Sequence, residues 1–155
     1  MRFVADAMLG TLAKWLRILG YDTLFDPELD DHQLVRLARA EDRVLLTRDR
    51  DLSRRRGVRV LLIVNEHLEE QVSQALMDLD LEPDAAFSRC PVCNEPLEPV
   101  DLDTVRARVP AYVAQTHKTF RLCSGCRRVY WRGTHWRRMA EQVARFRRPT
   151  GAGRS

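Results

Sequence analysis

The stretch Val44-Leu45-Leu46-Thr47-Arg48-Asp49-Arg50-Asp51 places two carboxylates, one residue apart, shortly after an apolar run. The run predicts a buried strand, and the ends of such strands are where open α/β sheets present their ligands. Two aspartates this close repel each other unless a positive charge lies between them, and a divalent cation commonly supplies that charge. The alternative is a solvated turn in which an Asp caps a short helix.

The composition indicates one ordinary globular domain, or a small domain followed by a metal-held module. Hydrophobic residues make up 45% of the 155 positions, and no apolar run approaches the roughly 20 residues that a membrane-spanning helix needs. Arg2 brings a charge too early for the apolar core of a signal peptide. We therefore expect a cytoplasmic protein with no membrane partner.

The net charge of +4 is divided unevenly along the chain. Residues 1–84 contain 12 Lys/Arg and 17 Asp/Glu, whereas residues 85–155 contain 14 Lys/Arg and 5 Asp/Glu. An acidic part followed by a basic part suggests a metal site in the first and a polyanion partner for the second. An Arg-rich composition also follows from a GC-rich genome, and this alternative weakens the inference of a polyanion partner from the positive charge of residues 85–155.

Strand and helix signals alternate over the first 80 residues. The expected strands are Met1–Asp6, Tyr21–Phe25, Arg43–Thr47 and Val58–Val64. The expected helices are Met8–Leu19, His32–Ala40, a turn over Asp51–Arg56, and Leu68–Leu79. This order predicts an α/β domain over residues 1–84, with a parallel sheet flanked by helices.

Two features predict helix ends in this domain. Gly20 follows the first helix at the position where a left-handed residue commonly ends a helix. Asp30, with Gln33 three residues later, forms the pattern of a capping box before the second helix.

All four cysteines lie in the second part, as Cys90-Pro91-Val92-Cys93 and Cys123-Ser124-Gly125-Cys126. Two residues between paired cysteines is the spacing of a zinc knuckle, in which both thiolates of a tight turn reach one metal. Four thiolates complete one tetrahedral site, so we expect one structural Zn²⁺ per chain. A disulfide is the weaker alternative in a cytosolic protein.

The remaining signals predict a zinc ribbon over residues 85–146, after a boundary at Glu82-Pro83-Asp84. A helical segment is expected at Thr104–Gln115, between the two cysteine pairs. Ribbon strands are expected at Phe120–Leu122 and Val129–Trp131, and a final helix from Thr134 to Phe146. Residues 147–155 are expected to form a flexible tail.

Several carboxylates are expected at one edge of the predicted sheet. Asp6 ends the first strand and Asp49 follows the third, with Asp51 one turn further on, and Asp30 or Asp31 begins the second helix. Such a set of oxygen ligands would bind one or two Mg²⁺ or Mn²⁺ ions. The Thr47 hydroxyl would orient Asp49 or a metal-bound water. Asp51 stands at the start of a helical turn, so it could instead cap that turn.

Six segments carry a resemblance to a known family: Phe3–Gly10, Leu12–Arg17, Leu19–Asp22, Leu46–Asp51, Cys90–Asn94 and Val129–Trp136. Together they resemble the Mut-seven C-terminal RNase domain family. The resemblance extends from Phe3 to about Met139. It implies a PIN-like nuclease fold followed by a zinc ribbon, with RNA cleaved at a metal held by acidic residues.

By this resemblance the acidic positions are Asp6, Asp31, Asp49 and Asp51. The resemblance leaves two alternatives open. Asp30 is as acidic as Asp31. PIN-type sites also commonly carry a Glu in this region, where only Asp30 and Asp31 directly precede His32, so the resemblance leaves open whether one or two catalytic metals bind.

The predicted function is therefore a metal-dependent ribonuclease with RNA as its partner. Its candidate RNA-binding residues are Arg48, Arg50, Arg127, Arg128, Arg132, Arg137 and Arg138. Two alternative functions remain. One is a catalytically inactive RNA- or ribosome-binding protein, and the other is a toxin-like regulatory module that acts through a protein partner.

Overall fold

The computed structural model describes residues 1–146, and the predicted tail at 147–155 lies outside the described residues. Its contacts divide the chain into two compact units, of which the first is Met1–Asn94 and the second begins at Glu95. The first cysteine pair therefore belongs to the first unit. A division at residues 84 and 85 stays a prediction, because contacts do not show which segment folds independently.

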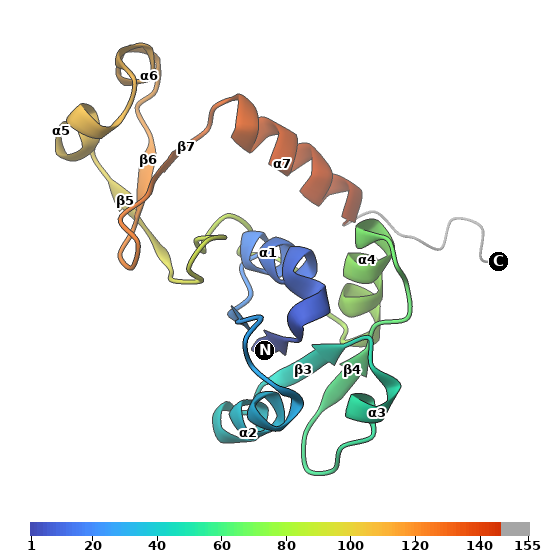
Figure 1. The fold of residues 1–155 in the computed structure, drawn as a ribbon. Coiled ribbons are helices and arrows are strands. Elements are labelled where there is room, and N and C mark those ends of the chain that lie inside the picture. The colour runs from blue at the N-terminus through green and yellow to red at the C-terminus, as the bar shows by residue number, and fades with distance from the viewer. Residues whose placement is uncertain (147–155) are drawn as a thin grey trace. The chain divides into compact units, whose positions relative to one another are not determined.

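The first unit is an α/β domain with four parallel strands in the order β2-β1-β3-β4. The strands are β1 Phe3–Ala5, β2 Thr23–Phe25, β3 Val44–Thr47 and β4 Val60–Leu62. The helices are the 3-10 turn η1 Ala7–Leu9, α1 Gly10–Ile18, α2 Asp31–Glu41, α3 Arg50–Ser53 and α4 Leu68–Asp78. Figure 1 shows α1 and α4 on one side of the sheet and α2 on the other. The predicted fold class is confirmed.

Burial on both faces explains the apolar composition of the central strands β1 and β3. Every residue of these two strands is buried. Val4 and Leu45 face α2, where they form a core cluster with Leu34, Val35, Ala38 and Leu52. Parallel strands covered by helices on both sides need such continuous apolar runs, because neither face of the sheet meets water.

The predicted helix signals lie where the helices begin and end. Gly20 has φ +100°, and an added Cβ would lie 2.3 Å from the Ala85 carbonyl oxygen, so a side chain is excluded there. Asp30 and Gln33 form the predicted capping box at the start of α2. The predicted first helix differs, because the chain makes one 3-10 turn before α1 begins at Gly10.

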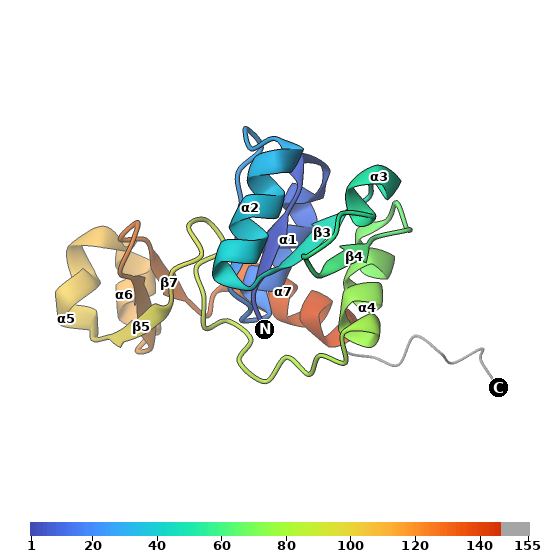
Figure 2. The ribbon, with the colours of Figure 1, turned by 90° about the horizontal axis from the view of Figure 1, so that it is seen from below.

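The second unit contains a three-stranded antiparallel sheet in the order β5-β6-β7. The strands are β5 Leu97–Val100, β6 Phe120–Cys123 and β7 Val129–Trp131. The helices are α5 Leu102–Val105, the 3-10 turn η2 Arg106–Arg108, α6 Ala111–Thr116 and α7 Thr134–Phe146. Figure 2 shows β5, α5 and α6 together in this unit.

Two predictions for this unit need correction. The single helical segment expected at Thr104–Gln115 is divided, since Pro110 lies between η2 and α6 and has no N–H to continue a helix. The strand β5 was not expected, and its Pro99 is tolerated because β5 lies at the sheet edge.

The helices pack on the sheet through Val105, Val109, Val113 and Phe120. None of the helices within residues 1–146 is long and apolar enough to span a membrane.

Candidate functional sites

The carboxyl ends of β1 and β3 are joined by a hydrogen-bonded chain through Thr47. The Thr47 hydroxyl donates to Oδ2 of Asp6, and the backbone N–H of Asp49 donates to the same hydroxyl at 3.0 Å. The backbone N–H of Met8 donates to Oδ1 of Asp6 at 3.1 Å, which fixes the second oxygen. Asp6 is only 8% exposed and Thr47 is fully buried, so both are held rigidly at this edge.

Asp49, rather than Asp51, is the N-cap of α3. Its Oδ1 accepts from the backbone N–H groups of Asp51 and Leu52, at 2.8 and 3.4 Å. Among the described residues, no hydrogen bond or ion pair uses Oδ2 of Asp49, which remains an acceptor on an exposed side chain. The capping role suggested for Asp51 is therefore wrong. Asp51 makes instead an exposed ion pair with Arg54 at 3.8 Å.

The capping box distinguishes Asp30 from Asp31. Oδ1 of Asp30 accepts from the N–H of Gln33 at 2.8 Å, so this carboxylate is committed to the helix end. Asp31 lies in the first turn of α2 and is exposed, and its carboxylate has no partner among residues 1–146. Asp31 is thus the freer acceptor of the two.

The structure links Asp6 with Asp49 but does not gather all four aspartates. Within residues 1–146, three or more His, Cys, Asp or Glu side chains come close enough to share a metal ion only at the four cysteines. Oxygen donors nonetheless match the chemistry of Mg²⁺ and Mn²⁺.

The Nε atom of Arg48, next to this edge in the chain, is buried without a hydrogen-bond partner in the described structure. A buried donor of this kind normally has a partner, so an acceptor is expected there.

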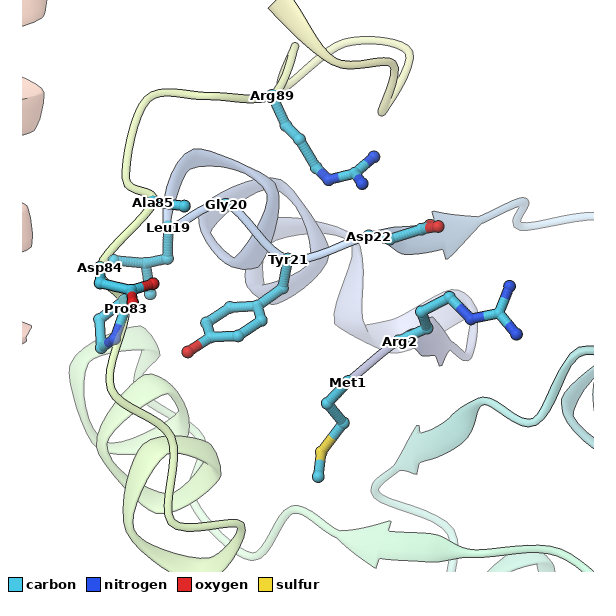
Figure 3. A pocket seen from close by; sticks show the side chains of 10 residues that line it. All are labelled: Met1, Arg2, Leu19, Gly20, Tyr21, Asp22, Pro83, Asp84, Ala85 and Arg89. Carbon is cyan, nitrogen blue, oxygen red and sulfur yellow. The ribbon is translucent and has the colours of Figure 1, made fainter.

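A cavity of about 320 Å³ lies at the opposite end of the sheet (Figure 3). Its lining includes Arg2, which precedes β1, Asp22, which precedes β2, and Arg89. Asp6 and Asp49 follow their strands, and parallel strands place these two sets at opposite edges. The cavity is therefore separate from the aspartate edge.

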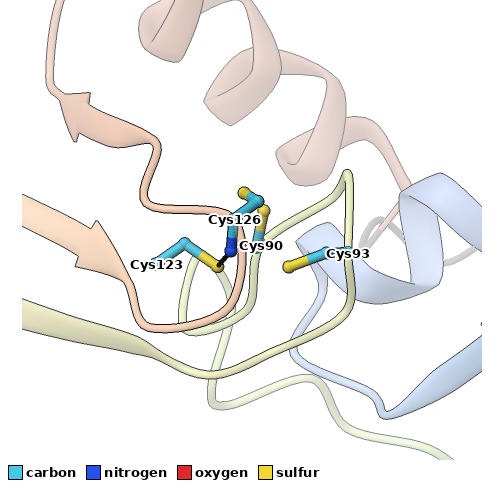
Figure 4. Close-up of side chains that lie close together, drawn as sticks. All are labelled: Cys90, Cys93, Cys123 and Cys126. Atoms are coloured by element: carbon cyan, nitrogen blue, oxygen red, sulfur yellow. Dashed lines mark hydrogen bonds between the residues drawn. The ribbon is translucent and has the colours of Figure 1, made fainter.

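The four cysteines form a compact cluster (Figure 4). The ligand atoms of Cys90, Cys93, Cys123 and Cys126 all lie within 4.8 Å of one another. The N–H of Cys126 donates to Sγ of Cys123 at 3.4 Å, which orients that sulfur within its turn. Four converging thiolates are the donor set of a structural zinc site, so the cluster can hold a metal such as zinc.

The candidate RNA-binding arginines fall into two groups. Arg48, which is half-buried, and Arg50, which is exposed, lie in the first unit beside the aspartates. The others belong to the second unit and are all exposed: Arg127, Arg128, Arg132, Arg137 and Arg138. The guanidinium carbon of Arg132 lies 4.9 Å from the ring centre of Trp136, a cation–π contact that holds this arginine at the surface.

The model of the Mut7-C RNAse domain family matches residues 1–143. The chain belongs to this family. Comparison with curated proteins and with solved structures gave no match. Membership indicates a nuclease role with RNA as the substrate class, and it covers both the aspartate edge and the four cysteines.

Two residues of this Mut7-C domain had no assigned role at the sequence level, although both lie in the segments that carry the family resemblance. Arg17 is 9% exposed and Asn94 is 8% exposed, and both are hydrogen-bonded around the first cysteine pair. A charged residue within an apolar helix face was the available signal for Arg17. Asn94, directly after Cys93, gave no signal beyond its position.

Proposed function

We propose that this protein hydrolyses RNA phosphodiester bonds at the edge formed by Asp6 and Asp49, with Asp31 and Asp51, in the presence of Mg²⁺ or Mn²⁺. The observation that supports this most is the Thr47 hydroxyl, which donates to Asp6 and accepts from the backbone of Asp49. It ties the carboxyl ends of two adjacent strands together. A purely capping aspartate pair would not need this link.

In the proposed site, each residue has a distinct task. Asp6 and Asp49 would hold the cation, with Asp31 and Asp51 completing its oxygen ligands. The chemistry that such a cation supplies when bound is activation of a water and stabilisation of the leaving oxygen. Thr47 fixes the side chain of Asp6 and the backbone of Asp49, so that neither must reorganise when RNA binds.

The arginines would bind the RNA backbone. Arg48, whose buried Nε is without a partner in the described structure, and the neighbouring Arg50 would contact a phosphate near the aspartates. The exposed arginines of the second unit would add contacts that carry no sequence information. Binding of this kind weakens as salt concentration rises, because phosphate contacts release counterions.

The test compares RNA cleavage by the wild type with cleavage by Asp6→Asn and Asp49→Asn, with Mg²⁺ or Mn²⁺ and mixed RNAs. Loss of a metal ligand should lower cleavage by at least about 100-fold, the upper range for residues that only support ligands. Asp42→Asn is the matched control, because Asp42 caps the far end of α2 at φ +51°, a conformation that Asn tolerates. Circular dichroism should show all variants folded.

Two outcomes would contradict the proposal. Cleavage that persists in both variants would place the chemistry elsewhere. A wild type that cleaves no RNA with either ion, while Asp49→Asn binds RNA as tightly as the wild type, would favour the inactive RNA-binding alternative. A chelator is a poor control, since zinc removal from the cysteines would disturb the fold.

A further inference from the structure

The first zinc knuckle is held by a buried arginine from a distant helix. Nη1 of Arg17, in α1, donates to the carbonyl oxygens of Pro91 and Val92, each at 3.1 Å. These are the two residues between Cys90 and Cys93. Nε of the same side chain donates to the Thr23 carbonyl at 2.8 Å, so the guanidinium bridges the end of α1, β2 and the knuckle.

Asn94 fixes the other end of this knuckle. Its backbone N–H donates to the Cys90 carbonyl at 2.9 Å and closes the turn. Its side-chain Oδ1 accepts from the backbone N–H of Thr23 at 2.9 Å, and its Nδ2 donates to Asp22 at 2.7 Å. Asn94 also has φ +74°, a left-handed conformation in which Asn is among the tolerated residues.

The network ends on an ion pair in the sheet. Asp22 pairs with Arg43 at 2.8 Å, and Arg43 also donates to the Phe3 carbonyl of β1 at 3.1 Å. Burial alone would raise the pKa of Asp22, but hydrogen bonds from Arg43 and Asn94 and the charges of Arg43 and Arg89 outweigh it and lower that pKa. A continuous chain of polar contacts therefore connects the knuckle to two strands.

The charge of Arg17 is complementary to a thiolate site. Burial lowers the pKa of Arg17, while negative charge on Cys90, Cys93 and Asp22 acts in the opposite direction. Four thiolates around one Zn²⁺ leave an excess of negative charge, which a nearby cation stabilises. A guanidinium provides both this charge and a fixed fork of donors, whereas a lysine ammonium provides only a compact charge.

We propose that Arg17 is a positioning residue of the zinc site, which fixes the Pro91–Val92 turn so that Cys90 and Cys93 hold the metal. It offsets part of the thiolate charge and slows zinc release. This role is independent of RNA cleavage, and the hydrogen bonds that support it go to the backbone carbonyls of Pro91 and Val92. Partners that hold ligands in place commonly change metal affinity by about 10–100-fold when they are lost.

The test measures zinc release from the full-length, zinc-loaded protein to a chromogenic chelator. Arg17→Gln should release zinc about 10-fold faster or more than the wild type. Arg17→Lys keeps the charge but loses the planar set of N–H donors, so its zinc release rate should lie between those of the wild type and Arg17→Gln. Arg36→Gln is the matched control, since Arg36 is an exposed arginine on α2, and it should release zinc at the wild-type rate.

A second measurement separates positioning from general stability. Co²⁺-substituted Arg17→Lys should show altered thiolate-to-metal absorption, because the Cys90–Cys93 turn has moved. A merely structural role would lower the melting temperature with and without zinc by the same amount, and would leave both the release rate and the Co²⁺ spectrum unchanged. That result would overturn the proposal. If Arg17→Gln does not fold, the zinc release rate of Arg17→Lys becomes the test. A release rate equal to that of the wild type would then overturn the proposal.

Discussion

The two candidate metal sites of this protein are built in opposite ways. The four cysteine ligand atoms lie within 4.8 Å of one another. Within each pair, the short spacing alone holds the two cysteines in one tight turn. The aspartates come from the ends of separate elements, and only Asp6 and Asp49 are joined, through Thr47. Like-charged carboxylates resist close approach without a cation, whereas thiolate turns bring their sulfurs together through local backbone geometry.

The largest expected effect is loss of the cysteine site. Cys123→Ser should lower the zinc content from about one per chain towards zero, because three thiolates leave the tetrahedral site incomplete. The second unit should lose its β-sheet signal, since metal binding and folding are coupled in such small modules. Metal analysis and circular dichroism measure both effects, and Ser124→Ala is the control within the same turn. A second unit that stays folded without zinc would contradict this coupling between metal binding and folding.

An intermediate effect should distinguish the two neighbouring aspartates of α2. Asp31→Asn should lower RNA cleavage by about 10-fold or more if Asp31 completes the cation ligands. Asp30→Asn should change neither cleavage nor stability noticeably, because Asn is as good an N-cap as Asp. Initial cleavage rates at saturating Mg²⁺ measure the difference. Equal rates for the two variants would remove Asp31 from the site.

The smallest expected effect concerns acid stability of the network that supports the first knuckle. The pKa of Asp22 is lowered in the folded protein, so its contribution is fully present above its unfolded pKa of about 4. That contribution is lost as the pH falls through the folded pKa. Asp22→Asn should therefore unfold more readily than the wild type above about pH 4, with the difference shrinking at lower pH. Denaturant unfolding at several pH values measures it, and a difference that is constant with pH would contradict the assignment.

Local patterns predicted the elements well where one segment contained its own signals. The capping box of Asp30 and Gln33, the terminator Gly20 and the bounds of α7 all depend on residues close together in the chain. The strand β5 was missed because it is short, contains Pro99 and is defined by its pairing with β6. The capping role that the sequence left open for Asp51 belongs to Asp49, and the two residues lie too close together for sequence spacing to separate them.

The sequence by itself identified the four cysteines as candidate metal ligands, because two residues between paired cysteines suffice to form each turn. It also determined the alternation of strands and helices, through apolar spacing. Only the tertiary structure decided that β1 lies beside β3, which joins Asp6 to Asp49 through Thr47. It alone brought Arg17 to the carbonyls of Pro91 and Val92, more than 70 residues away in the chain. Backbone carbonyls carry no sequence signature, so such a contact exists only once the fold has formed.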